Sequence, residues 1–196
     1  MKKKNILIIG AGIHGLFLTY YLKRNLNNKI TIIEKKPTIC SGSSNATQKR
    51  ANRGYHYPRC SLTRTECKDG WNFFRKNFKR FLFNISSSFY LIEKRSITKT
   101  NDYEKFLKKA NLPYKILPIS KSIFKSDNIN SIFKVFEGCF DHNSIRNYLK
   151  KSLSSKNIKI FKNFNLIKIK RNILTQEITL ISDKKKIKGK YDYIIN

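Results

Sequence analysis

The chain has 196 residues, of which 40% are hydrophobic and 13% aromatic, which suffices for one full domain or for one domain with a second inserted into it. Its formal net charge is +30, from 42 Lys and Arg against 12 Asp and Glu, so attraction to polyanions at low salt is expected from charge alone. The basic residues are spread along the chain without a long patterned run, which disfavours a specific nucleic-acid-binding element.

The start of the chain, "MKKKNILIIGAGIHGLFLTYYL", has a basic head and an apolar stretch. Gly10, Gly12 and Gly15 interrupt that stretch, His14 lies within it, and no small-residue cleavage site follows. It is also too short and too broken for a transmembrane helix. We therefore interpret it as the first strand and helix of a soluble domain.

The cysteines are Cys40, Cys60, Cys67 and Cys139, and their spacing fits no metal motif and no CxxC pair. We expect no metal site, and reduced thiols in a cytoplasmic protein.

The first predicted elements form a β-α-β unit. Residues 6–9 are a continuous apolar run typical of a buried parallel strand, and the apolar spacing predicts a helix over 13–24. Residues 30–33 form a second buried strand, and Glu34 follows at its carboxyl end.

Between strand and helix, Gly10, Gly12 and Gly15 form a G-x-G-x-x-G pattern. The first glycine permits a tight turn, the second a close approach of pyrophosphate, and the third close packing of helix and strand. The helix N-terminus attracts phosphate, and an acid at position 34 can accept hydrogen bonds from ribose and disfavours a 2′-phosphate. The unit predicts binding of an adenine dinucleotide. The residues predicted to bind it here are Gly10, Gly12, Ile13, His14, Gly15, Glu34 and Lys35.

The segment that follows distinguishes FAD from NAD. The string "GSSNATQKRANRGYHYPR" resembles the FAD-dependent oxidoreductases of the D-amino-acid-oxidase-like superfamily, also called the glutathione-reductase-2 type. The resemblance extends over essentially the whole chain, through "GAGIHG", "TRTECKDGWNFFRKNF", "EGCFDHNSIRNYLKKSL" and "YDYIIN". It implies FAD as the cofactor.

The resemblance also implies where the cofactor lies. Residues 41–46 would approach the pyrophosphate and the flavin edge, and residues 48–57 would pass along the isoalloxazine ring. Many relatives have His at the position of Asn52, so covalent attachment there is not expected. The implied additional contacts are Ser43, Ser44, Ala46 and Gln48.

His56 is the remaining imidazole near the predicted flavin and the candidate catalytic residue, as a proton shuttle or flavin contact. The alternative is that His56, Tyr55 and Tyr57 only pack a buried loop. Arg59 could bind an acidic substrate group or lie on the surface, and we expect Arg64 at the surface.

Further elements follow in chain order. An amphipathic helix is predicted over 65–81 and a strand over 86–96. A helix capped by Thr100 or Asn101, with Pro113 beyond its end, and a strand over 132–140 follow. This strand–helix–strand insert resembles the start of the family's antiparallel substrate domain.

After the insert, a helix is predicted from Asp141 or Asn143, then a strand over 158–163 that returns to the nucleotide-binding sheet. Residues 165–172, 177–182 and 185–190 alternate as in a β-meander, and 191–196 forms another buried parallel strand.

The predicted fold is α/β: a Rossmann-like FAD-binding domain with an inserted, incomplete antiparallel substrate-domain segment. The predicted boundaries are 1–82 and 139–196 for the two parts of the FAD domain and 83–138 for the insert. Relatives continue well beyond this length. The chain is therefore expected to be a fragment of a longer protein, a truncated gene product or one half of a split enzyme, and each of these lacks the C-terminal half.

The predicted function is an FAD-dependent oxidoreductase, or its N-terminal portion, oxidising a small amine- or hydroxyl-bearing substrate by hydride transfer to flavin. Two alternatives remain. One is a catalytically incomplete dinucleotide-binding module, and the other is a basic nucleic-acid-binding protein.

Overall fold

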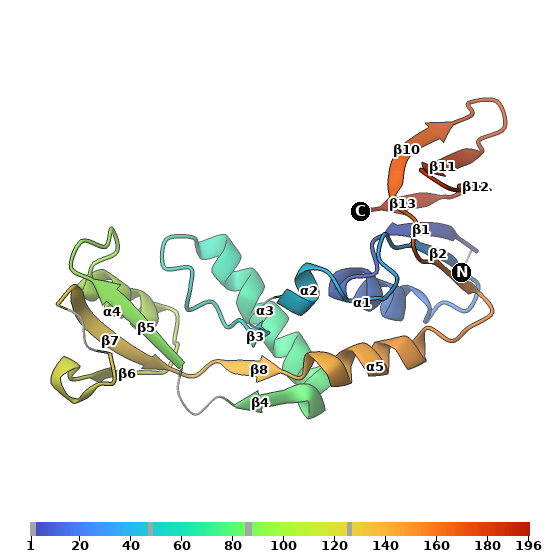
Figure 1. The fold of residues 1–196 in the computed structure, drawn as a ribbon. Coiled ribbons are helices and arrows are strands. Elements are labelled where there is room, and N and C mark those ends of the chain that lie inside the picture. The colour runs from blue at the N-terminus through green and yellow to red at the C-terminus, as the bar shows by residue number, and fades with distance from the viewer. Residues whose placement is uncertain (1–2, 47–48, 85–87, 125–126) are drawn as a thin grey trace. The chain divides into compact units, whose positions relative to one another are not determined.

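The computed structural model describes residues 3–46, 49–84, 88–124 and 127–196 (Figure 1). The chain divides into two compact units, one made of residues 1–47 and 142–196 and the other of residues 48–141. The chain therefore leaves the first unit once and returns to it, and each unit is described by itself.

The first unit is built on a four-stranded sheet in the order β13-β1-β2-β9, with all pairings parallel. Its strands are β1 (Asn5–Ile9), β2 (Lys29–Ile33), β9 (Ile158–Phe161) and β13 (Tyr193–Ile195). The register pairs Ile6 with Ile30 on one side and with Tyr193 on the other. The predicted return of 158–163 and 191–196 to this sheet is confirmed.

Helices α1 (Ile13–Leu22) and α5 (His142–Ser152) pack beside each other, and the hydroxyls of Tyr20 and Tyr148 are 3.1 Å apart. Helix α1 ends two residues before the predicted Arg24, within a turn. The short helix α2 (Ser43–Ala46) follows β2.

The predicted meander is confirmed as an antiparallel sheet of β10 (Leu166–Arg171), β11 (Ile178–Ser182) and β12 (Lys186–Gly189). Burial of apolar side chains holds it to the parallel sheet. The shared core consists of Leu7, Ile33, Phe164, Ile178 and Leu180.

The second unit contains two small antiparallel sheets. One is β3 (Arg50–Ala51), β8 (Gly138–Phe140) and β4 (Leu82–Asn84), and the other is β5 (Ser88–Glu93), β7 (Ile129–Val135) and β6 (Tyr114–Leu117). The helices are α3 (Ser61–Phe78) and α4 (Thr100–Lys109), with 3-10 turns η1 (Lys79–Phe81) and η2 (Ile119–Lys121).

Helix α4 covers the second sheet through a core that contains Tyr55, Tyr103, Leu107, Phe133 and Val135. The second unit, residues 48–141, is larger than the insert predicted over 83–138, because β3 and α3 also belong to it.

Three local predictions for this unit are wrong. Helix α3 begins at Ser61, not Thr65, with Cys60 as its N-cap. The N-cap of α4 is Lys99, because the Thr100 hydroxyl lies 2.7 Å from Ser131 Oγ instead. The predicted strand over 132–140 is two strands, because the chain breaks between them at the buried Glu137.

Candidate cofactor-binding site

The glycine loop between β1 and α1 is held to the end of β2 by backbone hydrogen bonds. Gly10 N donates to Ile33 O at 2.8 Å, and Cys40 N donates to Ala11 O at 2.9 Å. Gly10 has φ +99°, in the region that favours glycine. The first glycine therefore makes the tight turn that its position predicts.

Gly15 permits the close contact between loop and helix. A Cβ at this position would lie 2.2 Å from Gly10 O, which is backbone and cannot rotate away. Helix α1 consequently starts directly under the loop. Its N-cap, Gly12, supplies no side-chain cap, and its first turn has no acidic residue, so the helix itself places no negative side chain at the positive end of its dipole.

The carboxylate of Glu34 accepts two backbone hydrogen bonds. Ala11 N donates to Oε2 at 2.8 Å and Lys36 N donates to Oε1 at 2.9 Å. Each carboxylate oxygen has a further lone pair, so both can still accept from a sugar hydroxyl. Glu34 is thereby fixed beside the glycine loop, at the carboxyl end of β2.

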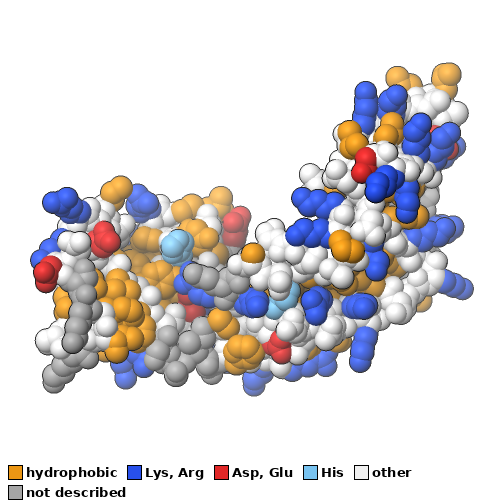
Figure 2. Space-filling model, viewed as in Figure 1, with side chains coloured by type: hydrophobic (Ala, Val, Ile, Leu, Met, Phe, Trp, Pro, Cys, Tyr) orange, Lys and Arg blue, Asp and Glu red, His pale blue; other side chains and the backbone are white. Residues whose placement is uncertain are grey.

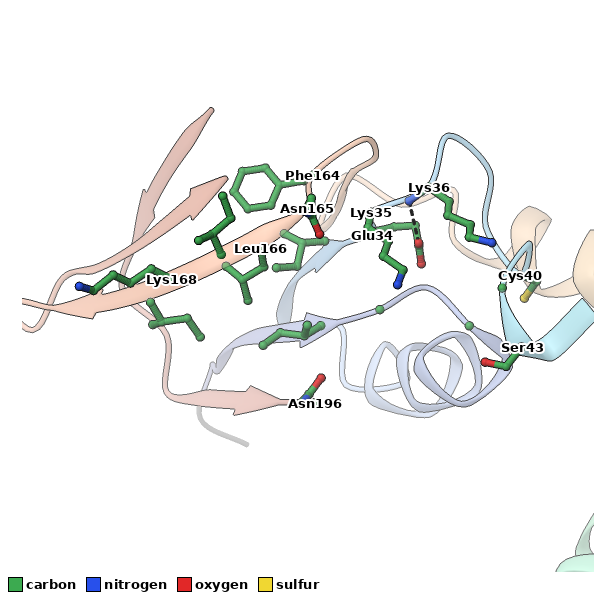
Figure 3. A pocket seen from close by; sticks show the side chains of 17 residues that line it. Glu34, Lys35, Lys36, Cys40, Ser43, Phe164, Asn165, Leu166, Lys168 and Asn196 are labelled. Atoms are coloured by element: carbon green, nitrogen blue, oxygen red, sulfur yellow. Dashed lines mark hydrogen bonds between the residues drawn. The ribbon is translucent and has the colours of Figure 1, made fainter. Parts of the chain in front are cut away.

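A cavity of about 700 Å³ opens at this edge of the sheet (Figure 3). Its walls are the glycine loop, the end of β2, the segment into α2, the start of β10 and the residue after β13 (Figure 3). The lining residues are Ile9, Gly10, Gly12, Ile33, Glu34, Lys35, Lys36, Cys40, Gly42, Ser43, Phe164, Asn165, Leu166, Ile167, Lys168, Ile169 and Asn196.

Cys40 closes one side of the cavity. It is 1% exposed, and its burial raises the pKa of the thiol to about 11, opposed by the charge of Arg146 and reinforced by that of Glu34. The thiol therefore stays protonated at neutral pH and acts as an apolar wall.

Of the residues predicted from sequence, Gly10, Gly12, Glu34, Lys35 and Ser43 line the cavity. Gly15 lies beneath the loop rather than in the cavity wall. Ile13 and His14 form the first turn of α1, with His14 exposed, and Ala46 is exposed at the end of α2. Ser44 is in α2, but its side chain, like the whole of Gln48, lies outside what the structure describes.

The sequence did not indicate that Lys36, Cys40 and the segment 164–169 belong to this site. The connection to 164–169 runs through the backbone, because Phe164 N donates to Glu34 O at 2.9 Å and Glu34 N donates to Phe161 O at 2.8 Å. Backbone pairing of this kind leaves no residue-type signal, so no motif could have revealed it.

His56 lies in the other unit. It is exposed and lines a cavity of about 330 Å³ with Tyr55, Tyr57, Arg59 and Tyr90 among its neighbours. Tyr55 is fully buried and its hydroxyl donates to Pro113 O at 2.7 Å, so it packs the loop. The His56 ring lies 5.5 Å from the Tyr57 ring and 6.0 Å from the Tyr90 ring, and its role stays a prediction. Arg59 is exposed.

Arg64 is half-buried, and its guanidinium lies 5.4 Å from the centre of the Phe106 ring. Arg64, which was expected at the surface, is thus partly exposed and packs against an aromatic ring. Its aliphatic part also lies against Gly54.

The cavity lies where β1 has its two neighbours, β2 and β13, on opposite sides, which is the position at which open α/β sheets bind ligands. A helix N-terminus, a glycine turn and a fixed carboxylate are the groups that a pyrophosphate and a ribose require. The fold and site define a dinucleotide-binding α/β domain.

The family model for DAO, described as FAD dependent oxidoreductase, matches residues 5–196. The chain belongs to this family of FAD-dependent oxidoreductases, and the resemblance inferred from its sequence is confirmed.

Among curated proteins, the FAD-dependent monooxygenase kojA of Aspergillus flavus is 30% identical over 83 residues, which cover 42% of this chain and 19% of that protein. Many solved structures share the fold, including the following two. The FAD-bound L-alpha-glycerophosphate oxidase of Mycoplasma pneumoniae has a TM-score of 0.66 at 14% identity, over 99% of this chain and 53% of its own.

Glycine oxidase of Geobacillus kaustophilus also has a TM-score of 0.66 at 14% identity, over 100% of this chain and 55% of its own. The chain thus spans about half the length of these structures. Within the described residues, no helix is both long and apolar enough to span a membrane.

Proposed function

We propose that the first unit binds FAD, and that the whole protein oxidises a small amine- or hydroxyl-bearing substrate by hydride transfer to the flavin. The observation that carries the proposal is the cavity at the carboxyl ends of β1 and β2, where the glycine loop, the N-terminus of α1 and Glu34 meet. The similar glycine and glycerophosphate oxidases carry names of substrates with an amine or a hydroxyl.

In this proposal the chain's own residues bind and orient the cofactor. The N-terminus of α1 and the loop around Gly12 hold the pyrophosphate, while Glu34 accepts hydrogen bonds from the adenosine ribose. The apolar wall of Ile9, Ile33 and Leu166 excludes water from the cofactor's flank. Flavin supplies the redox chemistry when bound, by accepting two electrons from the substrate C–H bond as a hydride.

We place the protein in the cytoplasm, because its four cysteines are free thiols. The similarity to a monooxygenase leaves hydroxylation as a second reaction class for the same cofactor.

The test is equilibrium binding of FAD and of ADP to the purified chain, by calorimetry and by flavin absorbance retained through gel filtration. We expect both ligands to bind, since they share the adenosine diphosphate part. Gly12→Val should lower both affinities by about 100-fold or more, because the added side chain would block the close approach of the pyrophosphate to the backbone. Gly12 has φ −71° and ψ 179°, a conformation that valine also adopts, so the substitution should not strain the backbone.

Glu34→Gln should lower the affinity for FAD and for ADP about tenfold, since it removes a charged hydrogen-bond acceptor. Glu66→Gln, an exposed acid on α3, is the matched control and should leave binding unchanged. FAD affinity that is indifferent to Gly12→Val would contradict the proposal. A protein that binds ADP but no flavin would favour the incomplete dinucleotide-binding module instead.

A further inference from the structure

The loop between β10 and β11, residues 172–177, carries two adjacent aliphatic side chains that extend into solvent. Ile173 is 79% exposed and Leu174 is 94% exposed. Single exposed apolar residues are ordinary on protein surfaces, whereas an adjacent pair at the end of a hairpin has no neighbour against which to pack. These two side chains therefore need an explanation.

The backbone at this tip is bonded from within the loop. Asn172 Oδ1 accepts from Leu174 N at 3.0 Å and from Thr175 N at 3.1 Å, and Gln176 Nε2 donates to Ile173 O at 2.5 Å. Polar backbone groups that already have partners cost less to remove from water. The backbone groups of Ile173, Leu174 and Thr175 that have these partners thus add less to the cost of placing the two aliphatic side chains in an apolar surrounding.

Cations lie directly behind the tip. Strand pairing places Lys170 and Arg171 opposite Thr179 and Ile178, and Lys188 pairs with Thr179 from the other side. The acidic residue of the loop, Glu177, is 3.9 Å from Lys188 Nζ.

The whole meander is strongly basic, and Figure 2 shows Lys and Arg side chains gathered on this part of the molecule with hydrophobic side chains at its outer end. Its exposed basic residues are Lys168, Lys170, Arg171, Lys184, Lys185, Lys186, Lys188 and Lys190, against the acids Glu177 and Asp183.

We propose that the β10–β11 hairpin binds the surface of an anionic phospholipid bilayer. Ile173 and Leu174 enter the boundary between head groups and acyl chains, and Lys170, Arg171, Lys188 and Lys190 bind the head groups. The phosphates of a nucleic acid could pair with these cations equally well, but a nucleic acid provides no apolar surrounding for Ile173 and Leu174. The two aliphatic side chains therefore favour lipid. This binding is independent of flavin.

The first test is co-sedimentation of the purified chain with phosphatidylcholine vesicles, with and without phosphatidylglycerol. The parent chain should bind the anionic vesicles and retain part of that binding at high salt, where purely electrostatic attraction is screened. The double variant I173S/L174S should bind about tenfold more weakly. Leu26→Ser is the matched control, because Leu26 is 81% exposed in the turn before β2, and its binding should equal the parent's.

The second test removes two of the positive charges behind the tip. K170Q/R171Q should lower affinity at low salt by about fivefold for each charge removed. These side chains are exposed, so the fold should be retained.

The third arm reports insertion directly. The chain has a single tryptophan, Trp71, so L174W adds one probe whose signal is obtained by subtracting the parent spectrum. With anionic vesicles, the added emission should shift to the blue and be quenched by brominated acyl chains, whereas L26W should do neither. The proposal is overturned if I173S/L174S binds the anionic vesicles like the parent. It is also overturned if high salt removes all binding and added duplex DNA displaces the chain from the vesicles completely, because charge alone would then account for the attraction.

Discussion

Two loops of this protein each precede a long helix, but they are held in different ways. The glycine loop before α1 is fixed mainly by backbone groups, through the bonds of Gly10 and Ala11 to the end of β2 and the segment after it. The loop of residues 52–60 before α3 is fixed by side chains that come from remote parts of its unit.

Three contacts show this second arrangement. Tyr55 Oη donates to Pro113 O at 2.7 Å across 58 residues, and Tyr103 Oη donates to Tyr55 O at 3.0 Å across 48 residues. Glu137 accepts from Arg53 N at 3.2 Å across 84 residues. Glycine spacing predicts a loop whose backbone groups bond to the strand that follows in sequence, whereas it does not predict a loop held by side chains distant in sequence.

The largest expected effect is that of Gly15→Ala. Its methyl group would meet Gly10 O at 2.2 Å, so the loop or the helix must move. We expect a loss of about 3 kcal/mol or more in the free energy of unfolding and loss of FAD binding. Urea denaturation followed by circular dichroism measures the first.

Gly70→Ala is the control for Gly15→Ala. Gly70 is on α3 with open space around its Cβ position, so alanine there should raise stability by about 0.5–1 kcal/mol through helix propensity. Equal stability of Gly15→Ala and the parent would show that the glycine loop does not depend on this close contact.

The second effect is that of Glu137→Ala on the loop of residues 52–60. The Glu137 side chain is 1% exposed and lies 3.3 Å from Arg50, whose side chain is 34% exposed, and it also accepts from Tyr90 Oη at 3.3 Å. Its removal leaves Tyr90 Oη and Arg53 N without this acceptor, whereas Arg50 Nη1 keeps Tyr90 Oη at 3.1 Å. We expect a loss of about 2–4 kcal/mol in the free energy of unfolding, reduced by the partial exposure of Arg50. Urea denaturation provides the measurement.

Glu104→Ala is the control. Glu104 pairs with Lys108 on the surface of α4 and accepts from Tyr114 Oη at 2.8 Å, and partly exposed contacts of this kind contribute less than those of a buried acid. If both variants unfolded at the same urea concentration, side chains would not be what holds the loop of residues 52–60.

The smallest expected effect concerns the reactivity of two thiols, one beside each loop, and does not involve stability. Cys60 is exposed, and hydrogen bonds from the Thr63 side chain and from the backbone of Thr63 and Leu62 lower its pKa. Cys40 is buried with a pKa of about 11. Iodoacetamide at pH 8 should therefore modify Cys60 first and Cys40 last, since the thiolate is the reactive form. Mass spectrometry of timed samples gives the order, and early modification of Cys40 would mean that its loop opens readily.

The sequence predicted much of the first unit because its signals are local. Apolar runs located β1 and β2, alternation located the meander, and the spacing of Gly10 to Glu34 located the cavity. Strands β3, β4 and β6 were missed, because two to four residues carry too little periodicity to be recognised. The break between β7 and β8 at Glu137 was missed, because the burial of this acid depends on hydrogen-bond partners that are distant in sequence.

The position of β1 in the sheet has a consequence for synthesis on the ribosome. One edge of β1 pairs with the nearby β2, but the other pairs with β13, and Asn5 N donates to Asp192 Oδ2 at 2.7 Å across 187 residues. Throughout most of translation, the nascent β1, an isoleucine-rich strand, therefore has one edge whose backbone hydrogen-bonding groups are unpaired. Such an edge can pair with a strand of another chain. We expect the nascent chain to need shielding by a chaperone until the distant strand emerges from the exit tunnel.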